Sequence, residues 1–494
     1  MADLVCKIGK IVGKNMEITQ MIIASLRGSL GFMVYLFHVD GFYKLNLLLG
    51  ITGLIVAVWG FSNDLIAVVG AFIAVTSFCI ALWISSHYKP SWGNEFVNIL
   101  HDGIPIPGVV APVKFRDFKP TTREESLGYK LIDAGFDSGE VALSSRRIDQ
   151  WLFLNQPAIA FTVGRSMAYR FCFQDKDEPG KFEKQIKYLY GKVKGKSNTT
   201  NENKFSMSPC FDDSITDISL AKVGYFDALV TNEAYRSTIR EKLKSSEQYT
   251  DLNIDLRMYF PYEMIYEEDI ERVMLSEMPI ESVANHVGIT TLVLSKDNYP
   301  IIFEQKKDMD QLPGKISLAG SGSADYRDIK DSGAEEFLDV IKYSMAREFF
   351  EEGKQNKLLK RKRNVIRSIA NDTIILGYFR WVDRCGKPEF IGATRSRNVR
   401  AKIVADRSEM NPLTSAYLKP IRNHKISETA HFVDLAKKLE NAVNEEGKKC
   451  RVGLSSAMTI FRLAEIAMKN ANDPEQVLLS SHLNIKATQW KGDP

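Results

Sequence analysis

Three glutamates follow a single arginine in residues 333–354, which read GAEEFLDVIKYSMAREFFEEGK. If these residues form a helix, Glu348, Glu351 and Glu352 lie three and four positions apart and share one edge of it. Three carboxylates on one edge repel one another. Mg²⁺ or Mn²⁺, which prefer oxygen ligands, would relieve that repulsion and could bridge to phosphate oxygens. Arg347 can pair with Glu351, one turn further on. The alternative is an ordinary solvated helix face.

The spacing around these glutamates resembles the signature of the Nudix hydrolase family. In that signature a Gly is followed by five residues, a Glu, seven residues, Arg-Glu, two residues and Glu-Glu. Here Gly333 opens the pattern, Asp339 stands at the inner Glu, and Arg347 stands at the Arg. The resemblance implies that the three glutamates are the catalytic and metal-binding residues. It also implies that Gly333, Asp339 and Arg347 support them.

Two positions depart from the family signature. Asp339 carries a shorter carboxylate side chain than the Glu of the family. The closing Gly of the signature should fall at Lys354, yet the chain has Gly353 one place earlier. These departures favour binding of a metal and a nucleotide over turnover, so it stays open whether the chain is an enzyme.

A segment rich in small residues precedes the signature. Residues 316–328 read ISLAGSGSADYRD. Four of them can bring backbone N–H groups close to a phosphate and are the predicted nucleotide-binding residues: Gly320, Ser321, Gly322 and Ser323. The alternative is a flexible linker. This segment and residues 377–395 both resemble an uncommon Nudix branch found beside bacterial cyclic-nucleotide synthases.

The charge of the chain is mild overall but locally concentrated. The net charge of +4 gives no reason to expect a nucleic-acid polymer as partner. A basic run after the signature could attract a nucleotide or an anionic membrane surface, although a solvated loop is the alternative. Its members are Lys357, Lys360, Arg361, Lys362, Arg363 and Arg367. The six cysteines are scattered without CxxC pairs, which argues against a disulfide framework or a zinc site.

The surrounding pattern predicts the elements that must position these residues. Two β-rich runs, 287–295 and 299–305, flank turn residues and predict a hairpin, and 373–382 predicts a further strand. An apolar spacing of three and four predicts helices over 430–444 and 455–471. These helices are expected to pack onto the strands.

Two long apolar runs lie near the N-terminus, at 45–61 and 65–84, with a polar turn at 62–64. At roughly 1.5 Å per residue they reach about 25 and 30 Å, which is enough to cross a bilayer core. Positive residues flank the pair and none lies in the turn, which predicts that both termini are cytoplasmic. One alternative is a hairpin buried in a soluble core. Another is a third span over 21–42, which otherwise reads as an interfacial amphipathic helix.

Together these patterns predict a membrane-anchored α/β protein, in which an N-terminal two-helix transmembrane hairpin precedes a cytosolic Nudix-type α/β/α sandwich. The predicted parts are a cytoplasmic segment with an amphipathic helix (1–44), the hairpin (45–86), a mixed α/β region (91–285), the Nudix-like domain (286–400) and C-terminal helices packed on it (401–494).

This order of parts resembles the transmembrane effectors of bacterial cyclic-oligonucleotide antiphage defence (CBASS). The resemblance implies a multi-pass protein of the bacterial inner membrane that binds a cyclic oligonucleotide messenger, self-associates, disrupts the lipid bilayer and kills the infected cell. The alternative is a membrane-anchored, Mg²⁺-dependent Nudix hydrolase of a nucleoside diphosphate linked to another group. A purely structural scaffold would explain neither the glutamates nor the apolar runs.

Overall fold

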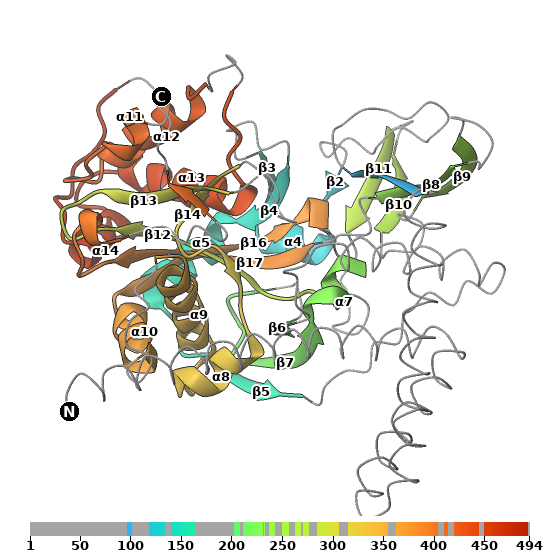
Figure 1. Ribbon diagram of the computed structural model, residues 1–494, viewed down its shortest axis with the longest axis horizontal. Helices are drawn as coiled ribbons and strands as arrows, with labels where there is room; N and C mark the ends of the chain where they lie inside the picture. The colour runs from blue at the N-terminus through green and yellow to red at the C-terminus, as the bar shows by residue number, and fades with distance from the viewer. Residues whose placement is uncertain are drawn as a thin grey trace, which may run out of the picture. The chain divides into compact units, whose positions relative to one another are not determined.

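The computed structural model describes seven stretches of the chain, some with short internal gaps: 96–100, 118–133, 140–164, 202–305, 315–353, 362–403 and 410–492. The chain divides into two compact units. In the first unit one antiparallel sheet is described, formed by β1 (Phe96–Leu100), β8 (Ser237–Lys242) and β9 (Tyr249–Asp255). All the other elements belong to the second unit, which carries the predicted site (Figure 1).

A nine-stranded sheet forms the centre of the second unit. Its main path runs β14 (Ile316–Leu318), β13 (Pro300–Gln305), β12 (Gly288–Leu294), β17 (Lys387–Arg395), β16 (Thr373–Trp381), β4 (Val141–Ser145) and β3 (Tyr129–Asp133). Two short strands lie beside this path: β15 (Gly322–Ser323) pairs with β12, and β18 (Met410–Pro412) pairs with β13. The neighbours β12 and β17 are parallel, whereas the other pairs are antiparallel.

Helices cover both faces of this sheet (Figure 1). Every residue of β12 and β16 is buried, as expected for strands with both faces covered. One face packs against α9 (Phe337–Glu352), with α8 (Tyr326–Ser332) and α10 (Lys362–Asn371) beside it. The other face packs against α12 (His431–Glu440), α13 (Leu454–Met468) and α14 (Pro474–Leu483), with α11 (Lys419–Arg422) nearby. Helix α5 (Arg146–Asn155) packs on β16.

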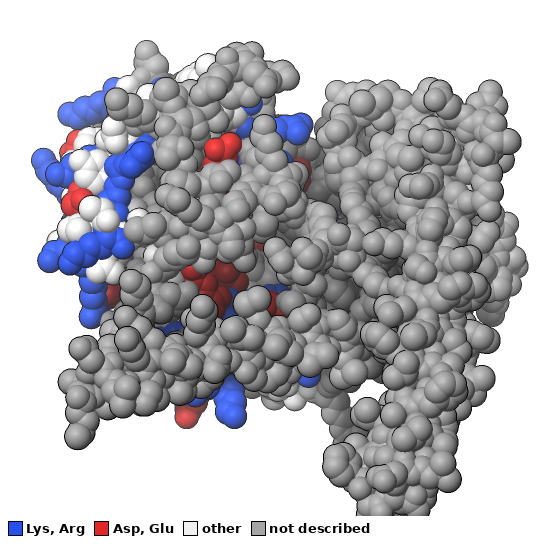
Figure 2. All heavy atoms as spheres, viewed as in Figure 1, with Lys and Arg blue, Asp and Glu red and all other residues white. Residues whose placement is uncertain are grey.

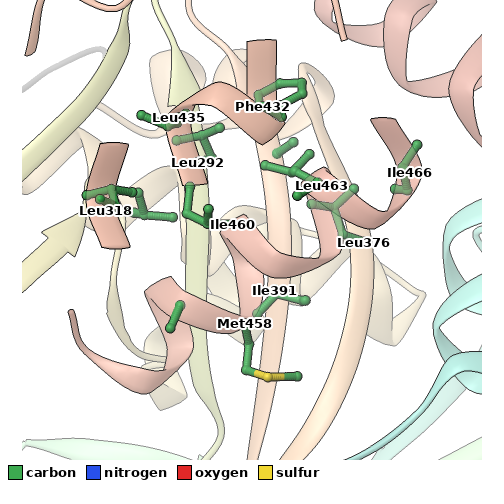
Figure 3. Packing of buried hydrophobic residues seen from close by; sticks show 14 of the residues in the cluster. Leu292, Leu318, Leu376, Ile391, Phe432, Leu435, Met458, Ile460, Leu463 and Ile466 are labelled. Carbon is green, nitrogen blue, oxygen red and sulfur yellow. The ribbon is translucent and has the colours of Figure 1, made fainter. Parts of the chain in front are cut away.

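Aliphatic side chains fill the layer between the strands and the C-terminal helices (Figure 3). Leu292, Leu376 and Ile391 come from adjacent strands, and Ile460 and Leu463 come from α13. Each is at most 1% exposed. Full burial of one such side chain stabilises a fold by about 1.5–3 kcal/mol. The C-terminal helices are therefore an integral part of the domain.

Shorter elements complete the second unit. Two three-stranded sheets have the strand orders β10-β11-β2 and β5-β7-β6. Their bounds are β2 (Phe118–Lys119), β5 (Ala160–Val163), β6 (Asn203–Ser206), β7 (Asp217–Gly224), β10 (Tyr262–Glu267) and β11 (Ile270–Leu275). The remaining helical pieces are α4 (Thr122–Ser126), α7 (Tyr225–Val230), η6 (Val382–Arg384) and η7 (Arg400–Lys402).

The structure contradicts the predicted membrane-anchored fold class and the predicted multi-pass membrane localisation. Among the helices of the described stretches, none is both long and apolar enough to span a bilayer. The longest, α9, has 16 residues, which reach only about 24 Å, and it buries an arginine and a glutamate. The fold is therefore corrected to a mixed α/β fold built on the nine-stranded sheet. The predicted segments 1–44 and 45–86 themselves lie outside the described residues.

Candidate functional site

Helix α9 carries the three predicted glutamates on its last turns and is fixed to the sheet by its apolar side. Phe337, Ile341, Met345 and Phe349 recur every four residues and are fully buried. The facing strand β17 has Gly392 at the point of contact, where a Cβ atom would lie 2.8 Å from the Met345 sulfur. Because Gly392 has no side chain, α9 can approach the sheet closely. This contact fixes the position of the glutamates relative to the sheet.

The Gly/Ser segment packs directly against two of these glutamates. The backbone N–H of Gly320 donates to Glu352 Oε2 over 2.5 Å. Gly320 has φ +75°, and a Cβ atom there would lie 2.7 Å from the Thr291 methyl group, so this position requires glycine. At Gly322 a Cβ atom would lie 2.5 Å from the carboxyl carbon of Glu348. The small residues therefore make room for the carboxylates of α9.

Arg347 is the centre of a buried ion-pair network at the same end of α9. Its Nε donates to Asp328 Oδ1 over 2.8 Å, and its Nη1 lies 2.9 Å from both Glu348 Oε1 and Glu351 Oε2. Its Nη2 donates to the carbonyl oxygen of Ser323 over 3.0 Å. The guanidinium thus joins α9, α8 and the Gly/Ser segment. The predicted pairing of Arg347 with Glu351 is confirmed.

The two glutamates that share Arg347 have opposite pKa shifts. Burial raises the pKa of Glu348 to about 7, against the attraction of Arg347. Burial also opposes the ionisation of Glu351, yet Arg347, Arg327 and Lys362 hold its pKa below the ordinary value. Near neutral pH the pair therefore holds one fixed carboxylate and one carboxyl group that titrates. Such separation of neighbouring carboxyl groups is typical of sites that move protons.

A cavity of about 530 Å³ is lined by residues of α8, α9 and α10. It is lined by Arg327, Asp331, Tyr343, Arg347, Lys362, Arg363, Asn364 and Ile366. Lys362 Nζ lies 2.7 Å and Arg327 Nη2 lies 3.3 Å from Glu351 Oε1, and Arg363 Nη2 lies 2.7 Å from Asp331 Oδ1. The side chains of Arg327 and Arg363 are 54% and 64% exposed, so an anion can reach them. Figure 2 shows acidic side chains in a recess at the middle of the visible face and Lys and Arg along one edge.

Asp325 connects this cavity to strand β6. Its carboxylate lies 2.5 Å from Lys204 Nζ, 2.9 Å from Arg327 Nε and 3.6 Å from Arg347 Nη1. Burial opposes its ionisation, but these three cations hold the pKa of Asp325 below its usual value. Asp325 therefore stays charged and holds three cations in place.

The arrangement of the three glutamates gives no support to the metal centre that the sequence predicts. Within the described stretches, no group of three or more His, Cys, Asp or Glu side chains is placed to hold a metal ion. Arg347 Nη1 lies between Glu348 and Glu351, and Glu352 accepts a hydrogen bond from the N–H of Gly320. This donor set does not fit a three-carboxylate site for Mg²⁺ or Mn²⁺ unless Arg347 moves. Metal binding stays a prediction.

The two other predicted support residues have different surroundings. Asp339 is 51% exposed, and its Oδ1 accepts from Lys342 Nζ over 3.1 Å, away from the Arg347 network. Gly333 ends α8 with φ +63°. A Cβ atom at Gly333 would lie 2.8 Å from Arg367 Nη2. Arg367 in turn donates to the carbonyl oxygen of Asp331 over 2.9 Å. Gly333 thus shapes the helix end, whereas the contact found for Asp339 among the described residues is with Lys342.

The hydrogen bonds of the predicted nucleotide-binding segment are directed to the protein. Gly320 donates to Glu352, the Ser321 hydroxyl donates to Leu318 O over 2.7 Å, and the Ser323 carbonyl accepts from Arg347. The segment therefore positions α9. A direct contact with a phosphate by this segment stays a prediction.

Four charged residues of the site escaped sequence reasoning: Lys204, Asp325, Arg327 and Asp328. Asp325 and Asp328 lie in residues 316–328, where only the small residues drew attention. Asp328 Oδ2 accepts from the Asp325 N–H over 3.0 Å, an acidic pair spaced by three that marks a helix start. Lys204 gives no such signal, because it meets Asp325 across 121 positions of sequence.

No protein-family model matches the chain, and no curated protein matches it. The geometry of this site and the resemblance of its residues to the Nudix signature are therefore the basis of the proposed function.

Proposed function

We propose that the second unit binds a phosphorylated nucleotide, with its phosphate groups in the basic cavity beside α9. The observation that carries this proposal is the lining of that cavity, where four cationic side chains meet one acidic side chain. Arg presents a planar fork of N–H donors that matches phosphate oxygens, and such pairs are among the stronger hydrogen bonds in proteins. A volume of about 530 Å³ is in the range of small-molecule sites.

The resemblance of residues 316–328 and 377–395 to Nudix proteins encoded beside cyclic-nucleotide synthases supports one ligand class above others. A cyclic oligonucleotide carries at least two phosphodiesters, each with one negative charge. Arg327 and Arg363 are the most exposed of the four cations and are the side chains we expect to contact a phosphate. Under this proposal the chain is the messenger-binding component of an antiphage defence system of the CBASS type.

Isothermal titration calorimetry with a panel of cyclic di- and trinucleotides, alongside ADP-ribose, tests the proposal. Arg363→Gln should weaken binding about tenfold, because it removes charged hydrogen bonds to one phosphate. Arg397→Gln is the matched control, since Arg397 is also exposed and also pairs with a single aspartate, Asp372, outside the cavity lining. Equal affinities of the two variants, or no binding of any nucleotide by the wild type, would reject the proposal.

A second function is favoured by one specific observation, the opposed pKa shifts of Glu348 and Glu351. A carboxyl group with a pKa of about 7 can accept and donate protons at neutral pH, as a pyrophosphate hydrolase requires. The test is product release from ADP-ribose with added Mg²⁺ or Mn²⁺. Activity that Glu348→Gln abolishes would favour the hydrolase, whereas binding without turnover would favour the messenger-binding role.

A further inference from the structure

Among the described residues outside the basic cavity that carry buried polar atoms without a hydrogen-bond partner, four lie close together in the fold: Ser206, Asn285, His286 and Trp381. The atoms are Ser206 Oγ, Asn285 Nδ2, both ring nitrogens of His286, and Trp381 Nε1. The first three residues are 0% exposed and Trp381 is 2% exposed. Roughly nine in ten buried polar groups in proteins are paired, so several unpaired groups in one region need an explanation.

Strand geometry places the side chains of Ser206 and His286 on the same side of their strands. Ser206 is the bridge partner of His286, and Phe205 and Val287, their neighbours, point into the hydrophobic cluster under α9. Because side chains alternate along a strand, Ser206 and His286 point away from that cluster. Gly288, two residues after His286, lies on the same side. Its missing side chain leaves room there for the carboxylate of Glu389.

The same region holds three buried cations. Lys204, Arg384 and Lys387 are 7%, 3% and 2% exposed, and after burial itself these three charges hold the pKa of His286 well below its usual value. The Arg384 guanidinium lies 4.0 Å above the Trp381 ring. The imidazole is therefore neutral and lies near three buried positive charges.

Two carboxylates also lie in this region, and both are already bound. Glu389 pairs with Lys387 and accepts from the Ser455 hydroxyl over 3.0 Å. Asp325 pairs with Lys204. The unpaired atoms of Ser206, Asn285, His286 and Trp381 are mostly N–H and O–H donors, and an acceptor-rich group would satisfy them.

The backbone beside His286 is held in an uncommon conformation. Asn285 has φ +38°, and its N–H donates to Asn232 Oδ1 over 2.9 Å. The Asn232 amide donates in return to Asn285 Oδ1 over 2.9 Å and to the Arg384 carbonyl over 3.0 Å. These hydrogen bonds of Asn232 hold Asn285 and His286 in a fixed position relative to the turn between β16 and β17.

We propose that these residues form a second binding site, which takes a phosphate-type oxyanion between Ser206, His286 and Trp381. Their donors would reach the oxyanion oxygens directly, while Lys204, Arg384 and Lys387 would supply the positive potential. The site is distinct from the basic cavity, since none of its members lines that cavity. It does not depend on nucleotide binding at Arg363.

The test uses inorganic phosphate as the probe and full-length protein labelled with ¹⁵N-histidine. Phosphate should shift the His286 ring signals, because a nearby anion favours the protonated ring. The shift should persist in Arg363→Gln, which weakens only the basic cavity. Ser206→Ala should reduce phosphate affinity at this site about tenfold by removing one donor to a charged group.

Two controls keep the outcome decisive. Ser344→Ala removes another buried hydroxyl, whose partner is the Val340 carbonyl at 3.0 Å, and should leave phosphate affinity at His286 unchanged. The loss of one pair of ring signals in His286→Phe assigns the His286 signals. If His286→Phe fails to fold, the ring signals whose response to phosphate changes in Ser206→Ala identify the site. The proposal would be overturned if phosphate left the His286 signals unchanged, which is the result expected if only water fills the site. An equal response in the wild type and Ser206→Ala would also overturn it.

Discussion

Replacing Arg347 with methionine should destabilise the second unit more than any other single change in the candidate site. The side chain is only 5% exposed and pairs with Asp328, Glu348 and Glu351. Asp328 is the most sensitive of these, because it is fully buried and both of its oxygens lie within 3.0 Å of Arg347 Nε. Methionine preserves much of the volume but leaves that charge unpaired.

The expected loss follows from this geometry. Breaking a buried ion pair by removing one partner costs about 3–5 kcal/mol. The individual hydrogen bonds are not summed, since contacts in one network are not additive. With a urea m value of about 3 kcal/mol/M, the unfolding midpoint should fall by about 1–2 M. Urea unfolding followed by fluorescence of the six tryptophans measures the shift.

A second variant distinguishes the cost of the unpaired charge of Asp328 from the cost of the packing that is lost with Arg347. Adding Asp328→Asn to Arg347→Met removes the stranded charge and should recover more than about 1 kcal/mol. Arg327→Met serves as the control, because Arg327 is 54% exposed and its ion pairs contribute less than about 1 kcal/mol. A loss in Arg347→Met no larger than in Arg327→Met, or no recovery in the double variant, would refute the reasoning.

Three further outcomes follow from the same region and from the contact of α5 with β16. Glu348→Gln should flatten the decline in stability between about pH 4.5 and 7, measured by urea unfolding. A carboxyl whose folded pKa is raised to about 7 favours folding below its unfolded value of 4.5 and loses that contribution as pH rises through 7. Gly320→Ala should cost about 1–3 kcal/mol in thermal unfolding, because φ is +75°, whereas Gly322→Ala should cost less, since only the flexible Glu348 side chain must move. Asp149→Asn should remove a similar decline between pH 3.8 and about 6, because burial raises the pKa of Asp149 to about 6, while the new amide oxygen still accepts from Tyr378 N–H.

Local pattern was sufficient to predict the elements whose signals are contained in one stretch of sequence. The predicted hairpin at 287–305 is confirmed as β12 and β13, and Asn298 in its turn has φ +71°, as turn chemistry allows. The strand at 373–382 and the helices at 430–444 and 455–471 are confirmed as β16, α12 and α13. In α12 the spacing of the apolar residues matches the face that the helix buries, whereas β12 and β16 are apolar runs that are buried along their whole length.

Elements that depend on distant partners could not be predicted in the same way. Strands β3 and β4 come from the predicted mixed region, yet β4 pairs with β16 more than two hundred residues later. Their five-residue stretches carry little local signal, and the pairing depends on packing that only the folded chain provides. The direction of Glu352 toward Gly320 likewise depends on how the Gly/Ser segment docks, which helical spacing does not specify.

Asp339, at the inner acidic position of the Nudix pattern, lies on the predicted helix but does not contact Arg347 in the described part of the chain. Asp339 matches the spacing, but it is half exposed and bonds Lys342, while Asp328 from α8 binds Arg347 in the interior. Asp339→Asn should therefore change stability by less than about 0.5 kcal/mol, and nucleotide affinity should stay within the error of the titration. Asp328→Asn should lower both, because it removes the carboxylate that orients Arg347 at the cavity wall. Comparing the two variants by urea unfolding and by calorimetry tests this assignment. If Asp339→Asn lowered stability and affinity more than Asp328→Asn, Asp339 would be the supporting residue, as the family pattern indicates.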